Sequence, residues 1–357
     1  MLSFCFISIS CKHLLANTIL IYYRNNNDFS IKKCRNPSKV DKNAQLAALI
    51  LLGGKIERNN NLPILPSHKN GVYYVEHCKI VAKDTRLSFI RSEEAFDKAI
   101  SLPHLNLSVL LLGPGTSLTQ QAAKLLSLEG VIVGFTAGGG SPLFLASNSE
   151  YRPTEYLQAW IKWWEDEDAR LAVAKFYQME RISNVEKYWP KYFNKNFTNL
   201  IGKPCQKYRS GLQNADSVNE LLGHEANFTK SLYKILAKHY GVNNFQREHK
   251  NGSEGSANQF LDHGNYIAYG FANVALWGLG VPPSLAVIHG KTRRGALVFD
   301  LADVFKDSLV LPCAFKCASE DYTSSGFRKE LIDLFDKTST LKNMFNITKK
   351  SALLDIQ

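Results

Sequence analysis

The chain has 357 residues, of which 45% are hydrophobic and 21% are charged. This composition excludes a disordered or fibrous protein and gives room for two domains, each with its own core. Lysine and arginine number 43 against 32 aspartates and glutamates, so the net charge is +11. The excess favours a polyanionic partner such as nucleic acid, although a basic surface also fits a protein without one.

Residues 1–60 carry no motif for chemistry, and we expect an N-terminal extension of unknown role. The first 23 residues are apolar in patches, but Lys12, His13 and Asn17 interrupt them. No apolar run approaches the ~20 residues that a membrane span needs. A weak membrane-surface helix is one interpretation of this segment, and a start codon set too far upstream or a poorly ordered extension is at least as good. The location we expect for the protein is the cytoplasm. The cysteines lack a zinc-site spacing and are interpreted as reduced thiols. They are Cys5, Cys11, Cys34, Cys78, Cys205, Cys313 and Cys317.

Residues 61–147 are predicted to form a small β-rich domain. The segment GVYYVEHCKIVAKDTRLSFI (71–90) is typical of a β-hairpin that turns at Lys83–Thr85. The segment LSVLLLGPGTSLTQQAAKLLSLEGVIVGF (107–135) predicts strand, glycine turn, helix and strand, with Thr116 or Ser117 as the helix cap. Its glycines are interpreted as turn residues, because no dinucleotide-binding or P-loop pattern surrounds them.

Residues 148–337 are predicted to form a larger, all-α domain. A helical period begins at Pro153 and continues to Ile182. The polar segment KNGSEGSAN (250–258) indicates a loop within this domain, and residues 338–357 are assigned to a C-terminal tail. The predicted fold class is therefore α+β, with a β-rich domain followed by a helical one.

An acidic residue interrupts an apolar helix face between Ser217 and Gly241. Glu225 lies at helical spacing on the face formed by apolar residues three and four positions apart. A carboxylate in such a stripe is costly to desolvate unless a cation or a metal ion meets it. A salt bridge and a metal site are equally good explanations on this helix alone. The apolar residues of the face are Val218, Leu221, Phe228, Leu232 and Ile235.

The segment VIHGKTRRGALVFDLADVFKD (287–307) places His289, Asp300 and Asp303 among core-like residues. Singly, each has an ordinary explanation, because buried histidines are usually hydrogen-bonded and aspartates often cap helices. Together with Glu225 they offer oxygen and imidazole ligands suited to Mg²⁺ or Mn²⁺.

A basic turn, Lys291, Arg293 and Arg294, lies between the histidine and the aspartates. We expect it to contact phosphates. A divalent metal ion beside a phosphate supports phosphodiester cleavage or strand transfer, which agrees with the positive net charge.

Six segments in this order resemble the CRISPR-associated integrase family, the first of the two near-universal Cas adaptation proteins, and are closest to type I subtype F. The resemblance covers about residues 61–335 and leaves residues 1–60 without a counterpart. It implies an N-terminal β-sandwich-like domain, a helical C-terminal domain and a homodimer formed largely through the former. The segments are LLGPGTSLTQQAAKLL, GVIVGFTAGGGSPLF, SEYRPTEYLQAW, LLGHEANFTKSLY, FLDHGNYIAYGFANVALWGLG and AVIHGKTRRGALVFDLADVFKD.

The resemblance also implies roles for residues and partners. Glu225, His289 and Asp303 match the family's metal ligands, and Asp300 matches the acidic neighbour that supports them. The family joins the 3′-OH of short captured DNA to the CRISPR repeat, and many members are metal-dependent nucleases. The second Cas adaptation protein bridges two dimers and in this subtype is usually fused to the helicase-nuclease.

The function we expect is therefore a metal-dependent DNA integrase of CRISPR adaptation with endonuclease activity. A non-catalytic DNA-binding scaffold is one alternative and predicts salt-sensitive binding without metal dependence. A general structure-selective nuclease is another and predicts cleavage of branched DNA without preference for a repeat end.

Overall fold

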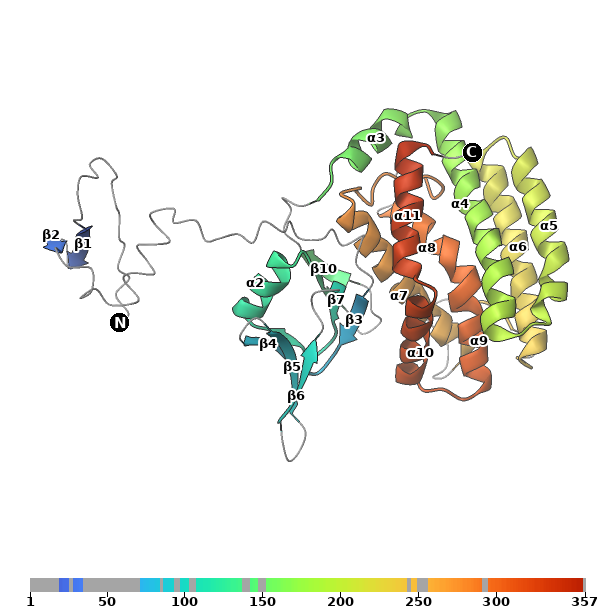
Figure 1. Cartoon of the computed structure of the whole chain (residues 1–357). Helices are drawn as coiled ribbons and strands as arrows, with labels where there is room; N and C mark the ends of the chain where they lie inside the picture. The colour runs from blue at the N-terminus through green and yellow to red at the C-terminus, as the bar shows by residue number, and fades with distance from the viewer. Residues whose placement is uncertain are drawn as a thin grey trace. The chain divides into compact units, whose positions relative to one another are not determined.

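The chain divides into two compact units, Met1–Leu62 and Pro63–Gln357. In the first unit the structure describes one antiparallel hairpin, β1 (Ile19–Asn25) paired with β2 (Asp28–Cys34) (Figure 1). The remaining residues assigned to the N-terminal extension lie outside the described part. The structure is a computed structural model and describes residues 19–25, 28–34, 71–83, 86–92, 97–102, 107–136, 142–146, 152–242, 245–248, 256–290 and 295–355.

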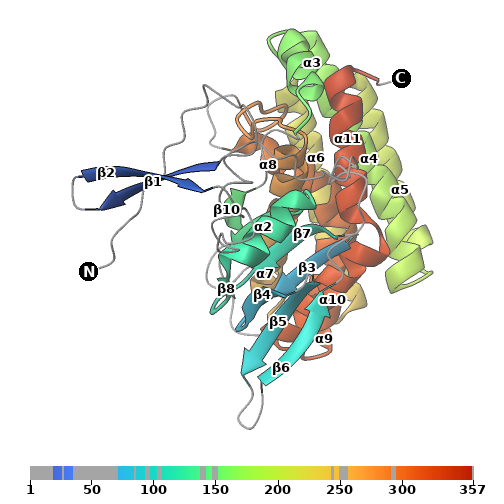
Figure 2. The same cartoon turned by 60° about the vertical axis from the view of Figure 1, so that its left-hand side comes forward.

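Within its described residues, the N-terminal part of the second unit contains two four-stranded sheets and one helix, α2 (Gln120–Leu128) (Figure 2). In the first sheet the order is β10 (Pro142–Ala146), β9 (Ile132–Thr136), β7 (Leu107–Leu112) and β3 (Gly71–Val75). In the second it is β6 (Asp97–Leu102), β5 (Arg86–Ser92), β4 (Lys79–Lys83) and β8 (Ser117–Leu118).

Strand β7 is apolar at nearly every position because both of its faces are covered. Leu110 and Leu112 belong to the core between the sheets and α2, whereas Val109 and Leu111 belong to the core of the helices. A strand buried on both faces loses the apolar–polar alternation of a surface strand. Strand β7 therefore contributes side chains to both hydrophobic cores of this unit.

The predicted hairpin is confirmed for its second part, since β4 and β5 are antiparallel with Lys83 paired to Arg86. Its first residues, Gly71–Val75, form β3 in the other sheet and pair in parallel with β7. The predicted cap of α2 is wrong: Thr119 caps the helix, and its Oγ1 accepts a hydrogen bond from the backbone N of Ala122 at 3.4 Å. Ser117 is unable to cap because it lies in β8, which pairs with β4. The chain forms this short strand before the helix begins.

The C-terminal part of the second unit is helical, which confirms the predicted fold class of a small β-rich part followed by a larger helical one (Figure 1). No described helix is both long enough and apolar enough to span a bilayer. Two short π-helical turns, η5 and η6, interrupt the α-helices. The elements are α3 (Glu155–Trp164), α4 (Glu167–Tyr188), η5 (Trp189–Phe193), α5 (Phe197–Asn214), α6 (Val218–His239), α7 (Ala257–Gly278), α8 (Ala296–Phe305), η6 (Lys306–Val310), α9 (Leu311–Ser319), α10 (Ser324–Lys337) and α11 (Thr340–Leu353).

The helical period predicted from Pro153 to Ile182 is divided between α3 and α4. Asp166 begins the second helix, because its Oδ1 accepts hydrogen bonds from the backbone N of Asp168 and Ala169. This is the expected role of an N-cap aspartate.

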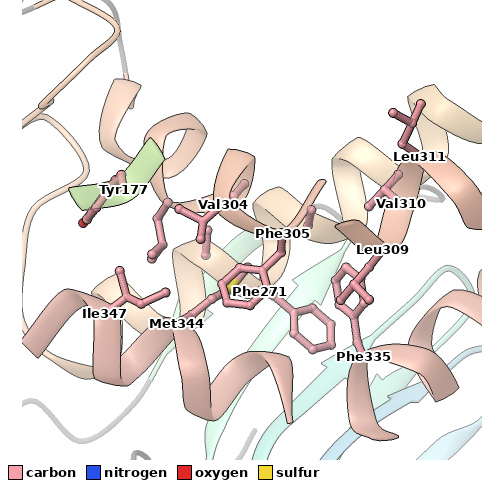
Figure 3. Close-up of a cluster of buried hydrophobic side chains, with 14 of the residues drawn as sticks. Tyr177, Phe271, Val304, Phe305, Leu309, Val310, Leu311, Phe335, Met344 and Ile347 are labelled. Carbon is pink, nitrogen blue, oxygen red and sulfur yellow. The ribbon is translucent and has the colours of Figure 1, made fainter. Parts of the chain in front are cut away.

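Residues 338–357, assigned from sequence to a tail, contain α11. Its apolar face is buried, and Trp163 Nε1 donates a hydrogen bond to the carbonyl oxygen of Ala352 at 3.1 Å. In Figure 3, Met344 and Ile347 of this helix lie in the same cluster as Phe305, at the end of α8, and Leu309 of η6. Helix α11 therefore helps to hold the segment on which the candidate site is built.

Candidate metal centre

Glu225 lies in the middle of α6, on a face whose Leu221, Phe228 and Leu232 are buried. Its side chain is only 16% exposed, and Oε1 lies 2.8 Å from Nη1 of Arg181 in α4. The other oxygen, Oε2, accepts a hydrogen bond from Nε2 of Gln178 at 3.0 Å. The salt bridge expected as one explanation for this carboxylate is therefore present.

Arg181 is almost fully buried and binds a second carboxylate, Asp307 of η6. Its Nε and Nη2 lie 2.7 and 2.6 Å from Asp307 Oδ2, and Nη2 also donates to Thr229 Oγ1 at 3.1 Å. Burial lowers the pKa of Arg181, but Asp307 and Glu225 more than offset it and hold that pKa well above the ordinary value. Burial raises the pKa of Asp307 despite the contact with Arg181. The guanidinium therefore joins α4, α6 and η6.

Asp300 organises the segment that contains His289. Its Oδ2 accepts hydrogen bonds from the backbone N of Val287 and Ile288 at 2.7 and 3.0 Å. Its Oδ1 accepts from the backbone N of His289 at 3.2 Å and lies 2.6 Å from that residue's Nδ1. Because α8 begins at Ala296, the explanation of Asp300 as a helix cap is wrong. Instead, this carboxylate fixes the backbone and the ring of the neighbouring segment.

Asp303 follows Asp300 by three residues and therefore faces the same side of α8. Its Oδ2 lies 3.8 Å from His289 Nε2, and its Oδ1 lies 2.6 Å from Nζ of Lys306. Lys306 also donates to the hydroxyl of Tyr269 in α7 at 3.3 Å. Burial raises the pKa of Asp303, but the charges of Lys306, Arg181 and His289 outweigh it, so the pKa of this carboxyl is lowered.

The pKa of His289 is raised above its ordinary value. Burial lowers this pKa, but the hydrogen bond and charge of Asp300 outweigh burial, and Asp303 and Glu225 add to the effect. The carboxylate of Asp300 accepts a hydrogen bond at this contact, so Nδ1 carries the hydrogen and Nε2 faces Asp303. This orientation is the one in which a histidine binds a metal ion through Nε2.

The structure joins three of the four predicted site residues by direct contacts, since His289 lies against both Asp300 and Asp303 of α8. Glu225 of α6 belongs to a second group with Arg181 and Gln178, and its charge acts on the imidazole of His289 without a direct contact. The roles of all four residues as ligands and catalytic groups stay predictions. The three predicted phosphate contacts, Lys291, Arg293 and Arg294, lie outside the described residues.

Sequence reasoning missed the partners of the acidic residues. Lys306 and Asp307 are the last two residues of the predicted segment, and their spacing from Asp303 on a helix was a usable signal. Arg181 and Gln178 come from a helix more than forty residues before Glu225, so no local pattern connected them with it.

The donor set fits a hard divalent ion by its chemistry. Glu225 and Asp303 supply oxygen atoms and His289 supplies a ring nitrogen held by Asp300, a combination typical of Mg²⁺ and Mn²⁺ sites. Among the residues described, no three acidic, histidine or cysteine side chains converge at metal-binding distances in this arrangement. Lys306 occupies one oxygen of Asp303 at 2.6 Å, and the other oxygen of this carboxylate faces Nε2 of His289. The residue types present therefore fit such an ion, and binding one would require Glu225, His289 and Asp303 to come closer together than they lie here.

Comparison with known proteins identifies the family. Residues 72–347 match the family model described as CRISPR associated protein Cas1. The chain belongs to the Cas1 family. This result confirms the resemblance inferred from the six sequence segments.

Individual relatives agree with the Cas1 assignment. A protein of Pectobacterium atrosepticum named CRISPR-associated endonuclease Cas1 is 40% identical over 298 residues, which cover 79% of this chain and 91% of the relative. The solved TtCas1–DNA complex has a similar fold, with a TM-score of 0.56 at 21% identity over 80% of this chain and 97% of that one. A partial Cas6-RT-Cas1–Cas2 complex gives a TM-score of 0.56 at 16% identity over 81% and 96%.

Proposed function

We propose that this Cas1 family protein is a divalent-metal-dependent DNA integrase of CRISPR adaptation, with endonuclease activity. The observation that carries the proposal is the contact of His289 with Asp300 and Asp303, together with the charge of Glu225 that acts on the same imidazole. The endonuclease name of the Pectobacterium relative supports a nuclease, and the net charge of +11 supports a DNA substrate.

The reaction proposed is a transesterification. The 3′-oxygen of a captured DNA fragment bonds to a phosphorus of the CRISPR repeat, and the bond from that phosphorus to its own 3′-oxygen breaks. The attacking hydroxyl loses a proton and the departing oxygen gains one, so no external energy source is needed. In the endonuclease reaction, water takes the place of the hydroxyl.

Bound Mg²⁺ or Mn²⁺ would polarise the phosphate and stabilise the departing oxygen. Glu225, His289 and Asp303 would hold the ion, and Asp300 keeps the imidazole in the tautomer with Nε2 directed at the site. Lys306 lies next to Asp303 and balances its charge in the absence of the ion. Lys291, Arg293 and Arg294 would contact DNA phosphates.

The partners proposed are duplex DNA, a second copy of this chain and the second Cas adaptation protein, in this subtype fused to the helicase-nuclease. The TtCas1–DNA complex and the complex that contains Cas1 and Cas2 support the first and third of these. We place this activity in the cytoplasm.

Strand transfer tests the proposal directly. Purified protein, with and without its bridging partner, is mixed with a labelled 3′-OH duplex and a supercoiled plasmid carrying the repeat, in Mg²⁺ or Mn²⁺. We expect label to join the plasmid, and we expect EDTA, His289→Ala or Asp303→Ala to abolish joining while DNA binding is retained. Binding persists because it depends on many dispersed positive charges.

Each alternative function gives a different result in the same assay. Tight DNA binding without joining under any condition supports the scaffold. Metal-dependent cleavage of branched DNA without preference for a repeat end supports the general nuclease. Full joining by Asp303→Ala would show that the metal ligands are assigned incorrectly.

A further inference from the structure

Both carboxylate oxygens of Glu225 are held by side chains of one helix, α4. Arg181 lies 2.8 Å from Oε1, and Gln178 donates to Oε2 at 3.0 Å. An ionised carboxylate has about four lone-pair sites, so two contacts leave about two for another ligand. The two contacts on different oxygens also fix the rotation of the carboxylate plane.

The amide of Gln178 has its own anchor, the hydroxyl of Tyr208 in α5. That hydroxyl donates to Gln178 Oε1 at 2.6 Å, and Arg181 Nη1 donates to the same oxygen at 3.4 Å. Because Oε1 accepts from two donors, the NH₂ group of Gln178 must point the other way, toward Glu225. The orientation of the amide is thus set by the network around it.

The ring of Tyr208 is itself held in place. It is buried and stacks on Phe228, with 4.6 Å between ring centroids and an interplanar angle of 26°. Phe228 follows Glu225 by three residues on the same face of α6. A chain of fixed contacts therefore runs from Phe228 through Tyr208 and Gln178 back to Glu225.

We propose that Gln178 and Tyr208 are positioning residues that hold Glu225 ready to bind the divalent ion. This inference rests on the proposed function, because it assumes that Glu225 is a ligand. Side chains that orient metal ligands commonly change metal affinity about 10- to 100-fold when they are replaced. Arg181 also contacts Glu225, but it is not a useful test residue. Its replacement would weaken metal binding by releasing Glu225 and would strengthen it by removing a positive charge that repels the ion.

The test uses uncharged replacements and the full-length protein. Mn²⁺ binding is measured from the electron paramagnetic resonance signal of free Mn²⁺, for Gln178→Met, Tyr208→Phe and the wild type. We expect the Kd for Mn²⁺ to rise about 10- to 100-fold for Gln178→Met. For Tyr208→Phe we expect a smaller, several-fold rise, because Gln178 Oε1 still accepts a hydrogen bond from Arg181.

Two further variants serve as controls. Glu225→Gln is the reference for loss of the proposed ligand. Arg209→Met breaks an ion pair of 2.8 Å with Glu186, which also joins α5 to α4 but touches no proposed ligand. We expect Arg209→Met to keep the Kd of the wild type within about twofold, since its pair is partly exposed.

The outcomes separate this inference from the proposed function. If the wild type binds no Mn²⁺, or Glu225→Gln binds it equally well, the proposed metal site is wrong. If Glu225→Gln weakens binding while Gln178→Met and Tyr208→Phe match the wild type, only the positioning role is wrong. A merely structural role would lower the melting temperature and leave the Kd of the folded protein unchanged. Tyr208→Phe removes only a hydroxyl group, so its Kd for Mn²⁺ tests the positioning role even if Gln178→Met fails to fold.

Discussion

His289 has a different partner at each ring nitrogen. Asp300 holds Nδ1 at 2.6 Å, and Asp303 lies 3.8 Å from Nε2. In the absence of metal, both carboxylates favour the protonated ring, and the raised pKa of His289 reflects this. Folding is therefore linked to protonation at this residue.

The sign of this linkage gives a pH prediction for protein kept in EDTA. A raised pKa in the folded state stabilises the fold below the ordinary histidine pKa of about 6.5, and this contribution is lost as pH rises through the folded-state value. We expect the difference in unfolding free energy between the wild type and His289→Asn to shrink as pH rises from about 6 to about 9. Urea denaturation at several pH values measures it.

His263 also titrates with folding, but it does not disturb the comparison of the wild type with His289→Asn. Burial lowers the pKa of His263, so its own effect on stability has the opposite sign, but it is present in both proteins and cancels. A difference between wild type and variant that is constant with pH would contradict the prediction.

The acidic residues could be predicted from sequence because each one interrupts an apolar stretch. Their partners could not. Gln178 and Arg181 lie in α4, where polar side chains occur on several faces, and nothing local marks these two as buried. Their burial results from the packing of α4 against α6 and η6, which is a tertiary effect.

The same contrast holds for secondary structure. The hairpin of β4 and β5 was predictable because its turn and its apolar runs are adjacent in sequence. The π-helical turn η6 was not, since its conformation depends on contacts with distant residues. Trp189 Nε1 donates to the carbonyl oxygen of Asp307 at 2.9 Å, and Asn184 Nδ2 donates to that of Val304 at 3.2 Å. These bonds supply partners to backbone groups where the helix is irregular.

Helix α7 packs closely at Gly264, which gives a prediction for this element. A Cβ atom there would meet Val310 Cγ1 of η6 and would lie 3.1 Å from Phe327 Cζ. We expect Gly264→Ala to destabilise the protein by about 1–3 kcal/mol, the usual cost of an overpacked core. Chemical denaturation measures the change in unfolding free energy.

Gly202 in α5 is the matched control. It is exposed, and an added Cβ meets no atom within 4 Å. Gly202→Ala should therefore stabilise the protein by about 0.4–1 kcal/mol, because alanine restricts the unfolded chain. Equal effects at the two glycines would show that backbone entropy, and not packing against η6, decides the outcome at Gly264.

At the scale of the whole molecule, the two ends of the chain differ in what they contribute. Residues 1–62 form a separate compact unit. Helix α11, at the other end, buries Leu341, Met344, Phe345 and Ile347 in the core that supports α8. Figure 3 shows Met344 and Ile347 in this core.

Two truncations test this difference. Removal of residues 1–62 should leave the melting temperature of the remaining unit unchanged. Removal of residues 340–357 should abolish cooperative unfolding. Each large buried side chain that is lost costs about 2–5 kcal/mol of unfolding free energy, and the sum over several of them exceeds a typical total of about 5–15 kcal/mol. Circular dichroism during heating measures both. A shortened protein that lacks α11 and still melts cooperatively would overturn the assignment of this helix to the core.

The four contacts that Asp300 makes with the segment 287–289 have a consequence for sequence divergence. This carboxylate ties the histidine directly to α8, so we expect the position of the imidazole to depend little on the length of the chain between Gly290 and Gly295. Both glycines have positive φ angles and open space around them. We therefore expect insertions, deletions or a peptide label between these two glycines to leave the contacts of the imidazole with Asp300 in place, whereas they would displace the proposed phosphate contacts Lys291, Arg293 and Arg294.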